Sequence, residues 1–496
     1  MKKYLFYINM ALFAAVLWSF YNKRNIQIKV PSVVNSQVVV NKQLTKEAIN
    51  IDNKNIEGKI HFNNNSFSNL KINYNNKKYN ILNCDSSWST TWNSKDSNTP
   101  NNDQWSSNSE SLSSDKPLIL TWKSPEGSIF VQSMQIVDDY IVKVEYSVFN
   151  ALSKPINIGL DLLTEKVKGN FIYQKDDATI RASKKHASIN TNSWHGFEDE
   201  YSAFAVIPKN NISYSYNSND SSSNVAFPSQ TINPKESSSW SFYVFAGPKK
   251  LSILKKYAKK YEANGLENLI NYGFLSIITK TIFAILSYIL SIFDNFAFAI
   301  CLLTLIVKII LAPFSYKSHI SMMKIQKLQP QIERIKEVNK GNNVATQQSI
   351  LALYKQESIN PLGGILPFVF QIPLFISLYA AISISIDSVN AGFLWIKDLS
   401  ISDPYSVNNL IKYFTAKSLP FDINLLSALF SITMIAQQWN TLKKQKDNFI
   451  LALPLVSAVL LSSYSSAFMI YMIWSNILAY LQSIIFNRII KKNYAN

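Results

Sequence analysis

The chain has 496 residues, with 49 Lys and Arg against 32 Asp and Glu and a formal net charge of +17. The positive residues are dispersed and form no dense basic run, so the composition argues against a nucleic-acid-binding protein. Two cysteines, and four histidines without metal-ligand spacing, provide neither a disulfide framework nor a metal site, and we expect no cofactor. Polar sequence extends to about residue 265 and long apolar runs follow, so a soluble part precedes a membrane part.

Residues 1–21 predict a membrane anchor. Lys2 and Lys3 precede an apolar run over 4–20 that is near the minimum length for a membrane span. No small-x-small cleavage site or lipidation cysteine follows, so we expect the anchor to remain uncleaved. A cleaved signal peptide is the alternative.

Residues 22–250 predict a β-sandwich on the outer side of the membrane. Apolar and polar residues alternate in YIVKVEYSV (140–148) and again in NISYSYN (211–217), as expected for strands with one buried face. Many short strands separated by polar breaks are typical of a sandwich. The Ser- and Asn-rich stretch 85–116 predicts a long mobile loop.

WHGFEDE (194–200) is the one cluster in this part that resembles a catalytic site, because His195 lies near three carboxylates. Successive residues of a strand point to opposite faces, so closeness in sequence does not make a catalytic pair. We therefore expect a structural or docking domain, and a hydrolase or sugar-binding site is the alternative.

Residues 251–293 are interpreted as a linker followed by an amphipathic helix over 273–293. This helix is long enough to span a bilayer, but a span here would reverse the orientation of every later segment. We therefore place it in the outer membrane interface, with Lys280 facing the headgroups.

Five apolar runs within 294–488 predict the remaining spans, at 295–314, 365–386, 425–439, 449–463 and 467–486. Lys and Arg concentrate after the first, third and last of these runs, which the positive-inside rule assigns to the cytoplasm. With the anchor, this gives six spans, both termini in the cytoplasm, and a short cytoplasmic tail at 489–496.

Residues 316–360 predict a cytoplasmic hairpin of two amphipathic helices that breaks at Gly341 and Asn342. One interpretation is a hairpin that packs only on itself. The other is a mobile lid that meets incoming chains or ribosomes through basic side chains. Those side chains are Lys324, Lys327, Arg334 and Lys336.

Lys308 lies inside the apolar stretch TLIVKIILAPF (304–314). A lysine near the middle of a span costs roughly 2.5 to 3.5 kcal/mol, so it indicates a functional site. However, Lys308 precedes Phe314 by only six residues, or about 9 Å of helix. Its side chain could then simply extend along lipid to the cytoplasmic headgroups.

Three stretches together resemble a known family: SMMKIQKLQPQIERIK (321–336), LALYKQESINPLGGILPFVFQIPLFISLYAAI (351–382) and LWIKDLSISDPY (394–405). They resemble the core of the YidC/Oxa-type membrane protein insertases over about 268–488. The polar half, with YSAFAVIP (201–208) and YVFAGPKKL (243–251), is similar to the periplasmic domain of the Gram-negative members.

The resemblance implies a polytopic α-helical protein of the bacterial inner membrane with a periplasmic β-sandwich. Five core spans would surround a hydrated groove that bears a positive charge. The protein would be no enzyme; it would insert hydrophobic segments of nascent membrane proteins into the bilayer, alone or with the Sec translocon, assist their folding, and contact ribosome–nascent chain complexes. The implied groove residues are Lys308, Thr304, Gln371, Tyr471 and Asn476.

Two departures from the family pattern are visible. Lys308 stands where the family has an arginine, and a buried lysine is a compact charge rather than a rigid five-donor fork. YSSAF (464–468) replaces the usual turn between the last two spans. Polar span residues such as Gln371 and Asn476 could instead make ordinary hydrogen bonds between helices. Two other functions stay open: a solute transporter or channel, and a membrane-tethered periplasmic protein that acts on glycans.

Overall fold

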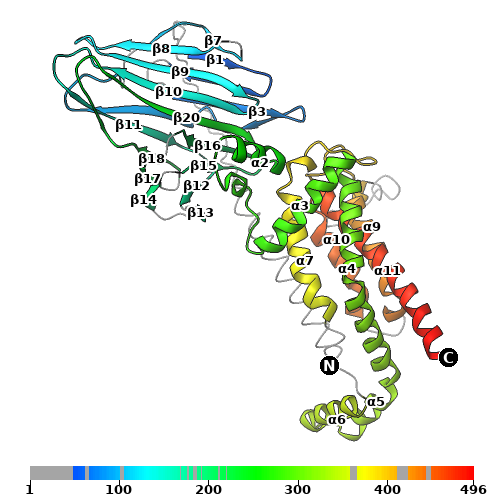
Figure 1. Cartoon of the computed structure of the whole chain (residues 1–496). Helices are drawn as coiled ribbons and strands as arrows, with labels where there is room; N and C mark the ends of the chain where they lie inside the picture. Colours follow the sequence, from blue (N-terminus) through cyan, green and yellow to red (C-terminus); the bar gives the residue numbers. More distant parts are fainter. Residues whose placement is uncertain are drawn as a thin grey trace, which may run out of the picture. The chain divides into compact units, whose positions relative to one another are not determined.

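A computed structural model describes most of the chain, from residue 48 to residue 495, with several gaps. The predicted anchor, 1–21, lies outside the described residues. The described residues are 48–61, 66–100, 105–114, 116–167, 169–175, 178–181, 187–191, 193–209, 213–218, 221–357, 366–409, 423–442 and 448–495. The chain forms one compact unit from residues 46–312 and 374–496, and residues 313–373 belong to a second unit. Strands fill the first part of the chain and helices the second, as predicted (Figure 1).

The first β-sheet has eleven described strands in the order β14-β17-β18-β11-β5-β3-β2-β1-β7, with β19 beside β11 and β4 beside β3. Apart from the parallel β1–β7 pair, its neighbours are antiparallel. The strands are β1 Ala48–Asp52, β2 Ile56–His61, β3 Ser66–Tyr74, β4 Lys77–Asn80, β5 Ser87–Ser94, β7 Ser111–Leu112, β11 Ile156–Glu165, β14 Ala187–Thr191, β17 Tyr214–Ser218, β18 Ser223–Ala226 and β19 Gln230–Ile232.

The second β-sheet has nine described strands in the order β13-β12-β15-β16-β20-β10-β9-β8-β6, all antiparallel. In β10, Val142, Val144, Tyr146 and Val148 are buried at alternate positions, which confirms the predicted strand. The strands are β6 Ser106–Ser107, β8 Leu118–Lys123, β9 Ile129–Asp138, β10 Ile141–Phe149, β12 Asn170–Lys175, β13 Ala178–Arg181, β15 His195–Glu198, β16 Ser202–Pro208 and β20 Ser237–Pro248.

Aromatic side chains join the two sheets. Trp92 of β5 in the first sheet makes edge contacts with Phe130, Tyr146 and Trp240 of the second, at ring-centroid distances of 5.1, 5.8 and 5.8 Å. Large aromatic side chains contribute most of the apolar area that such a core removes from water. The sheets therefore pack against each other across an aromatic core.

The prediction of a mobile loop over 85–116 is wrong. Strand β5 occupies Ser87–Ser94, and Trp88, Thr90 and Trp92 are buried on one face of it. The polar residues between them are partly exposed and form the other half of a period-two pattern, so the Ser-rich composition hid an ordinary strand.

Residues after β20 also pack on the sheets. Helix α2 (Leu251–Lys260) and the 3-10 turn η1 (Leu266–Leu269) bury Leu254, Tyr257, Leu266 and Leu269. The indole Nε1 of Trp194 donates to the carbonyl of Asn264 at 2.9 Å. We call the described residues of 48–272 the β domain.

The helices that follow are α3 Ser276–Phe293, α4 Phe296–Lys327, α5 Gln329–Val338, α6 Asn343–Gln356, α7 Leu366–Ser383, α9 Leu425–Leu442, α10 Asn448–Leu461 and α11 Ser466–Ala495. Each span predicted after residue 294 coincides with a helix. Among the described residues, three helices are long and apolar enough to cross a membrane by length and composition, namely α3, α4 and α11. The interfacial position of α3 stays a prediction.

In the second unit, α5 and α6 form the predicted hairpin. Ile325, Leu328, Ile332, Ile350 and Tyr354 make its apolar core. The predicted break is confirmed by a left-handed glycine at 341 (φ 94°) and by the residue 342 side chain, which caps α6. The four predicted basic contact residues are all exposed: Lys324, Lys327, Arg334 and Lys336.

Candidate functional site

Two side chains of α11 donate hydrogen bonds to the backbone of α4. Trp474 Nε1 donates to the carbonyl of Cys301 at 3.0 Å, and Gln482 Nε2 donates to the carbonyl of Lys308 at 3.1 Å. The second contact lies further toward the C-terminal end of both helices than the first, by about 10 Å along α4 and about 12 Å along α11. The helices therefore run parallel, as the predicted order of spans requires when three spans lie between them (Figure 1).

Lys308 emerges from the face of α4 that turns toward the protein. It follows Thr304 by one helical turn, and Thr304 is only 2% exposed. Ile309 and Ile310, which point the other way, are 61% and 63% exposed, whereas Lys308 is partly covered. Lys308 therefore lies on the partly covered side of α4 and not on its exposed side.

Thr304 and Tyr471 belong to the packed interior. The Thr304 hydroxyl donates to the carbonyl of Ile300 at 2.7 Å, within its own helix. Tyr471 is 1% exposed, and its ring lies 5.8 Å from that of Phe468. Thr304 of α4 and Tyr471 of α11 are therefore both buried side chains.

Asn476 and Gln371 lie in different settings. Asn476 Nδ2 donates to Thr433 Oγ1 of α9 at 3.2 Å, which is the interhelical bond considered as the alternative to a groove role. Gln371 lies in α7, partly exposed, two residues before Pro373.

Sequence reasoning missed Trp474 and Gln482. Together with Tyr471 and Leu478 they follow one another by three or four residues, so they share one face of α11. That spacing was available in the sequence, but the carbonyls that these side chains reach belong to a helix more than 160 residues earlier.

The loop between α7 and α9 caps two helices. Asp403 is 5% exposed, and its carboxylate accepts from the backbone N–H of Leu426 at 2.9 Å and from the indole of Trp395 at 3.2 Å. A carboxylate at this position accepts from N–H groups that have no partner within the helix. Its negative charge also interacts favourably with the positive end of the helix dipole. The carbonyls of Ile401 and Leu399 accept from the first two N–H groups of α11, at 2.7 and 3.0 Å. We call residues 386–409 the cap loop.

Aromatic rings surround the unusual YSSAF turn that precedes α11. Tyr464 lies 5.5 Å from the ring of Tyr379, and Phe468 lies 5.2 Å from that of Phe375. Packing between α7 and the start of α11 therefore fills the region where this chain departs from the family pattern.

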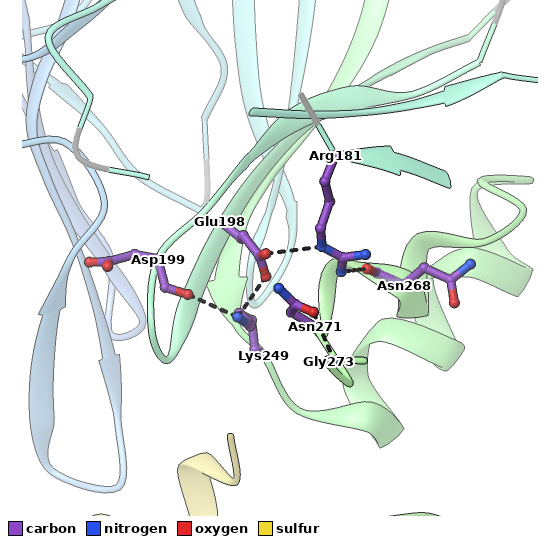
Figure 2. A network of polar contacts seen from close by, with 7 residues as sticks. All are labelled: Arg181, Glu198, Asp199, Lys249, Asn268, Asn271 and Gly273. Carbon is purple, nitrogen blue, oxygen red and sulfur yellow. Dashed lines mark hydrogen bonds and ion pairs between the residues drawn. The ribbon is translucent and has the colours of Figure 1, made fainter. Parts of the chain in front are cut away.

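His195 and Glu198 do not form a common site. They lie three residues apart on β15, so their side chains leave opposite faces of the strand. His195 Nδ1 contacts the Tyr214 hydroxyl at 2.9 Å, and burial lowers the pKa of His195 to about 3. Glu198 accepts from Lys249 at 2.8 Å and from Arg181 at 3.2 Å (Figure 2). These contacts indicate structural roles.

Comparison with known proteins assigns the family. Residues 288–493 match the family described as "60Kd inner membrane protein", and residues 67–285 match "YidC periplasmic domain". The membrane protein insertase YidC of Rickettsia conorii is 32% identical, over 78% of this chain and 75% of the relative. The chain is a member of the YidC membrane protein insertase family.

A second relative and two solved structures were also matched. The insertase YidC of Rickettsia bellii is 32% identical, over 79% of this chain and 76% of its own. A crystal structure of an active YidC insertase with its first transmembrane domain resolved matches with a TM-score of 0.39 and 16% identity, covering 88% of this chain and 92% of the other. The YidC structure from Thermotoga maritima matches with a TM-score of 0.32 and 11% identity, covering 88% and 99%.

Family membership decides the coarse function. This YidC-family protein is an inner membrane protein with a periplasmic domain, and it acts on nascent membrane proteins as an insertase rather than as an enzyme. That assignment replaces the two other functions considered, a transporter or channel and a glycan-acting protein.

Proposed function

We propose that this insertase moves hydrophobic segments through a hydrated groove in the helical core, in which Lys308 supplies the positive charge. The observation that carries the proposal is the position of Lys308 on the protein-facing side of α4, one turn beyond the buried Thr304. Tyr471, Asn476 and Gln371 are the further proposed wall residues.

The physical basis is the cost of moving polar groups through lipid. Backbone and charged groups of a substrate have no hydrogen-bond partners in the hydrocarbon region, and this sets the insertion barrier. A hydrated groove that reaches part of the way into the bilayer shortens that path. Lys308 attracts acidic residues of the substrate tail, after which the apolar segment leaves sideways into lipid, and no covalent bond is made or broken.

The proposed topology has six spans, with both termini in the cytoplasm and the predicted β-sandwich in the periplasm. Support comes from the parallel α4 and α11 and from the basic breaks on one side. Reporter fusions at positions 150, 340 and 445 test it. The signal is expected to be periplasmic at 150 and cytoplasmic at 340 and 445, and a periplasmic signal at 340 would contradict the topology.

The proposed partners are ribosome–nascent chain complexes and the Sec translocon, and the insertase also assists the folding of its clients. The exposed basic side chains of the hairpin suit an acidic partner surface. Replacing Lys324 and Arg334 by Glu is expected to weaken ribosome association measured by co-sedimentation. Unchanged binding would remove the hairpin from this role.

Complementation of an insertase-depleted bacterium tests the groove charge. Lys308→Arg is expected to restore growth and insertion, whereas Lys308→Ala fails or serves only weakly charged substrates, because only the charge attracts acidic tails. Lys317→Ala, at an exposed position of the same helix, is the matched control and should behave as wild type. Full rescue by Lys308→Ala with acidic-tailed substrates would overturn the electrostatic role.

A further inference from the structure

Three polar side chains from distant parts of the chain meet at one point between the β domain and the cap loop. Lys250 Nζ donates to the Tyr74 hydroxyl at 2.7 Å and to Asp387 Oδ1 at 3.0 Å. The Tyr74 hydroxyl donates to the same carboxylate oxygen at 3.0 Å. Tyr74 ends β3, Lys250 precedes α2, and Asp387 lies in the 3-10 turn η3 (Ile386–Ser388) that starts the cap loop.

The hairpin of β3 and β4 makes two more contacts with the cap loop, one from its turn and one from the first residue of β4. Lys77 Nζ lies 3.6 Å from Asp398 Oδ2, and Asn390 Nδ2 donates to the carbonyl of Asn75 at 3.4 Å. Asn75 and Asn76 both have positive φ, 50° and 58°, as a two-residue hairpin turn requires. This short turn is conformationally restricted, so it presents its contacts from a defined position.

The contacts are partly withdrawn from water. Asp387 and Asp398 are 19% and 15% exposed at their side chains, and burial together with the Asp387 charge raises the pKa of Tyr74. The phenol therefore stays neutral and remains a donor to the carboxylate. An exposed ion pair contributes little by itself, whereas charges that share partners in a partly buried network reinforce one another.

The same loop completes the N-terminal ends of α9 and α11 through Asp403, Ile401 and Leu399. We propose that the β3–β4 hairpin and Lys250 form a brace that holds the cap loop on these two helix ends. The periplasmic domain then has a mechanical function in the insertase: it keeps the cap loop bound to the N-terminal ends of α9 and α11.

The consequence concerns local opening. The first N–H groups of α9 and α11 donate to the cap loop. When that loop detaches, these N–H groups lose their acceptors, and faster amide hydrogen exchange reports the local opening. Without the brace, the cap loop detaches from the helix ends more often, while the strands and the helices themselves keep their structure. The inference depends on these contacts alone and not on the charge of Lys308.

Hydrogen exchange of the full chain in lipid nanodiscs, read by mass spectrometry, tests the brace. In Lys77→Ala/Lys250→Ala we expect amides of 423–430 and 466–470 to exchange about tenfold faster. The matched control is Lys78→Ala/Lys260→Ala. It removes two ion pairs inside the β domain, Lys78–Glu57 at 2.7 Å and Lys260–Asp138 at 2.6 Å, and should leave exchange at both segments unchanged.

A second variant changes the contact residue in the cap loop instead of those in the β domain. Asp387→Asn leaves the β domain untouched and should also speed exchange at 423–430 and 466–470, while β10 peptides exchange as in wild type. Wild-type exchange at both segments in Lys77→Ala/Lys250→Ala and in Asp387→Asn would overturn the brace. Equal acceleration in the Lys78→Ala/Lys260→Ala control would also overturn it, because the effect would then be general destabilisation. None of these results depends on insertion activity, so the groove proposal can fail independently.

Discussion

Replacing Lys249 by Met is expected to destabilise the β domain strongly. Lys249 follows the end of β20, and its side chain is 4% exposed. Its Nζ donates to Glu198 Oε2 at 2.8 Å and to the carbonyl of Asp199 at 2.9 Å. The Glu198 side chain is 2% exposed. Met has a similar length and fills the same space, so the variant removes the charge and its hydrogen bonds with little change in packing.

The magnitude follows from the partners that remain. Breaking a buried ion pair by removing one member costs about 3 to 5 kcal/mol, because the other charge stays buried without compensation. Here Arg181, whose side chain is 29% exposed, still donates to Glu198 Oε1 at 3.2 Å, so we expect the lower end, about 3 kcal/mol. For a domain of this size, that lowers the melting temperature by roughly 6 to 12 °C.

Thermal unfolding of the full chain, followed by β-domain tryptophan fluorescence, measures the effect. The double variant Lys249→Met/Glu198→Met provides the test of coupling. It should recover part of the lost stability, since no acid is left uncompensated, and the two single changes should therefore be non-additive. A melting temperature for Lys249→Met within about 2 °C of wild type, or strict additivity, would refute the buried-pair argument.

Four further predictions follow from single contacts. His195 has its pKa lowered to about 3 in the folded state, so its contribution to stability is present above the unfolded pKa and is lost as the pH falls. Between pH 8 and pH 5 that loss is about 2 kcal/mol, and His195→Gln should flatten the pH dependence of urea unfolding. Gly196→Ala would place a Cβ 1.9 Å from the carbonyl oxygen of Phe204, so it should cost more than about 3 kcal/mol or prevent folding, as judged by the yield of protease-resistant β domain. Asp403→Ala removes the cap of α9 and should cost about 1 kcal/mol, with faster hydrogen exchange at Leu426, whereas unchanged exchange there would exclude capping. Gln482→Leu should lower the free energy of unfolding by only about 0.6 kcal/mol. If the rate of insertion of acidic-tailed substrates falls by more than this loss of stability explains, Gln482 acts as a positioning residue for Lys308.

Local patterns in the sequence predicted much of the secondary structure. The period-two alternation identified β10, and the amphipathic helical pattern of 316–360 identified the hairpin. The apolar runs after residue 294 all became helices. These features depend on neighbours within one or two turns or along one strand, so the sequence carries them directly. The family resemblance supplied the coarse function in the same way, because its motifs lie in continuous stretches.

The same local reasoning failed where composition and periodicity disagreed. In 85–116, Ser and Asn dominate the composition, yet Trp88 and Trp92 alternate with them as a strand requires. For the WHGFEDE cluster, strand geometry had argued against a catalytic pair, and the contacts agree. His195 and Glu198 are close in sequence, but strand geometry sends them to Tyr214 on one side and to Lys249 on the other.

By itself, the sequence determined that a strand-rich part precedes a helical part, where the apolar helices after residue 294 lie, and which charge, Lys308, stands in an apolar run. Only the tertiary structure decided that Gln482 reaches the Lys308 carbonyl and that Lys250 and Tyr74 meet Asp387. The physical reason is that helix and strand periods are set by neighbouring residues, whereas these contacts join residues 137 to 313 positions apart. Such contacts depend on how whole elements pack, and no short stretch of sequence contains that information.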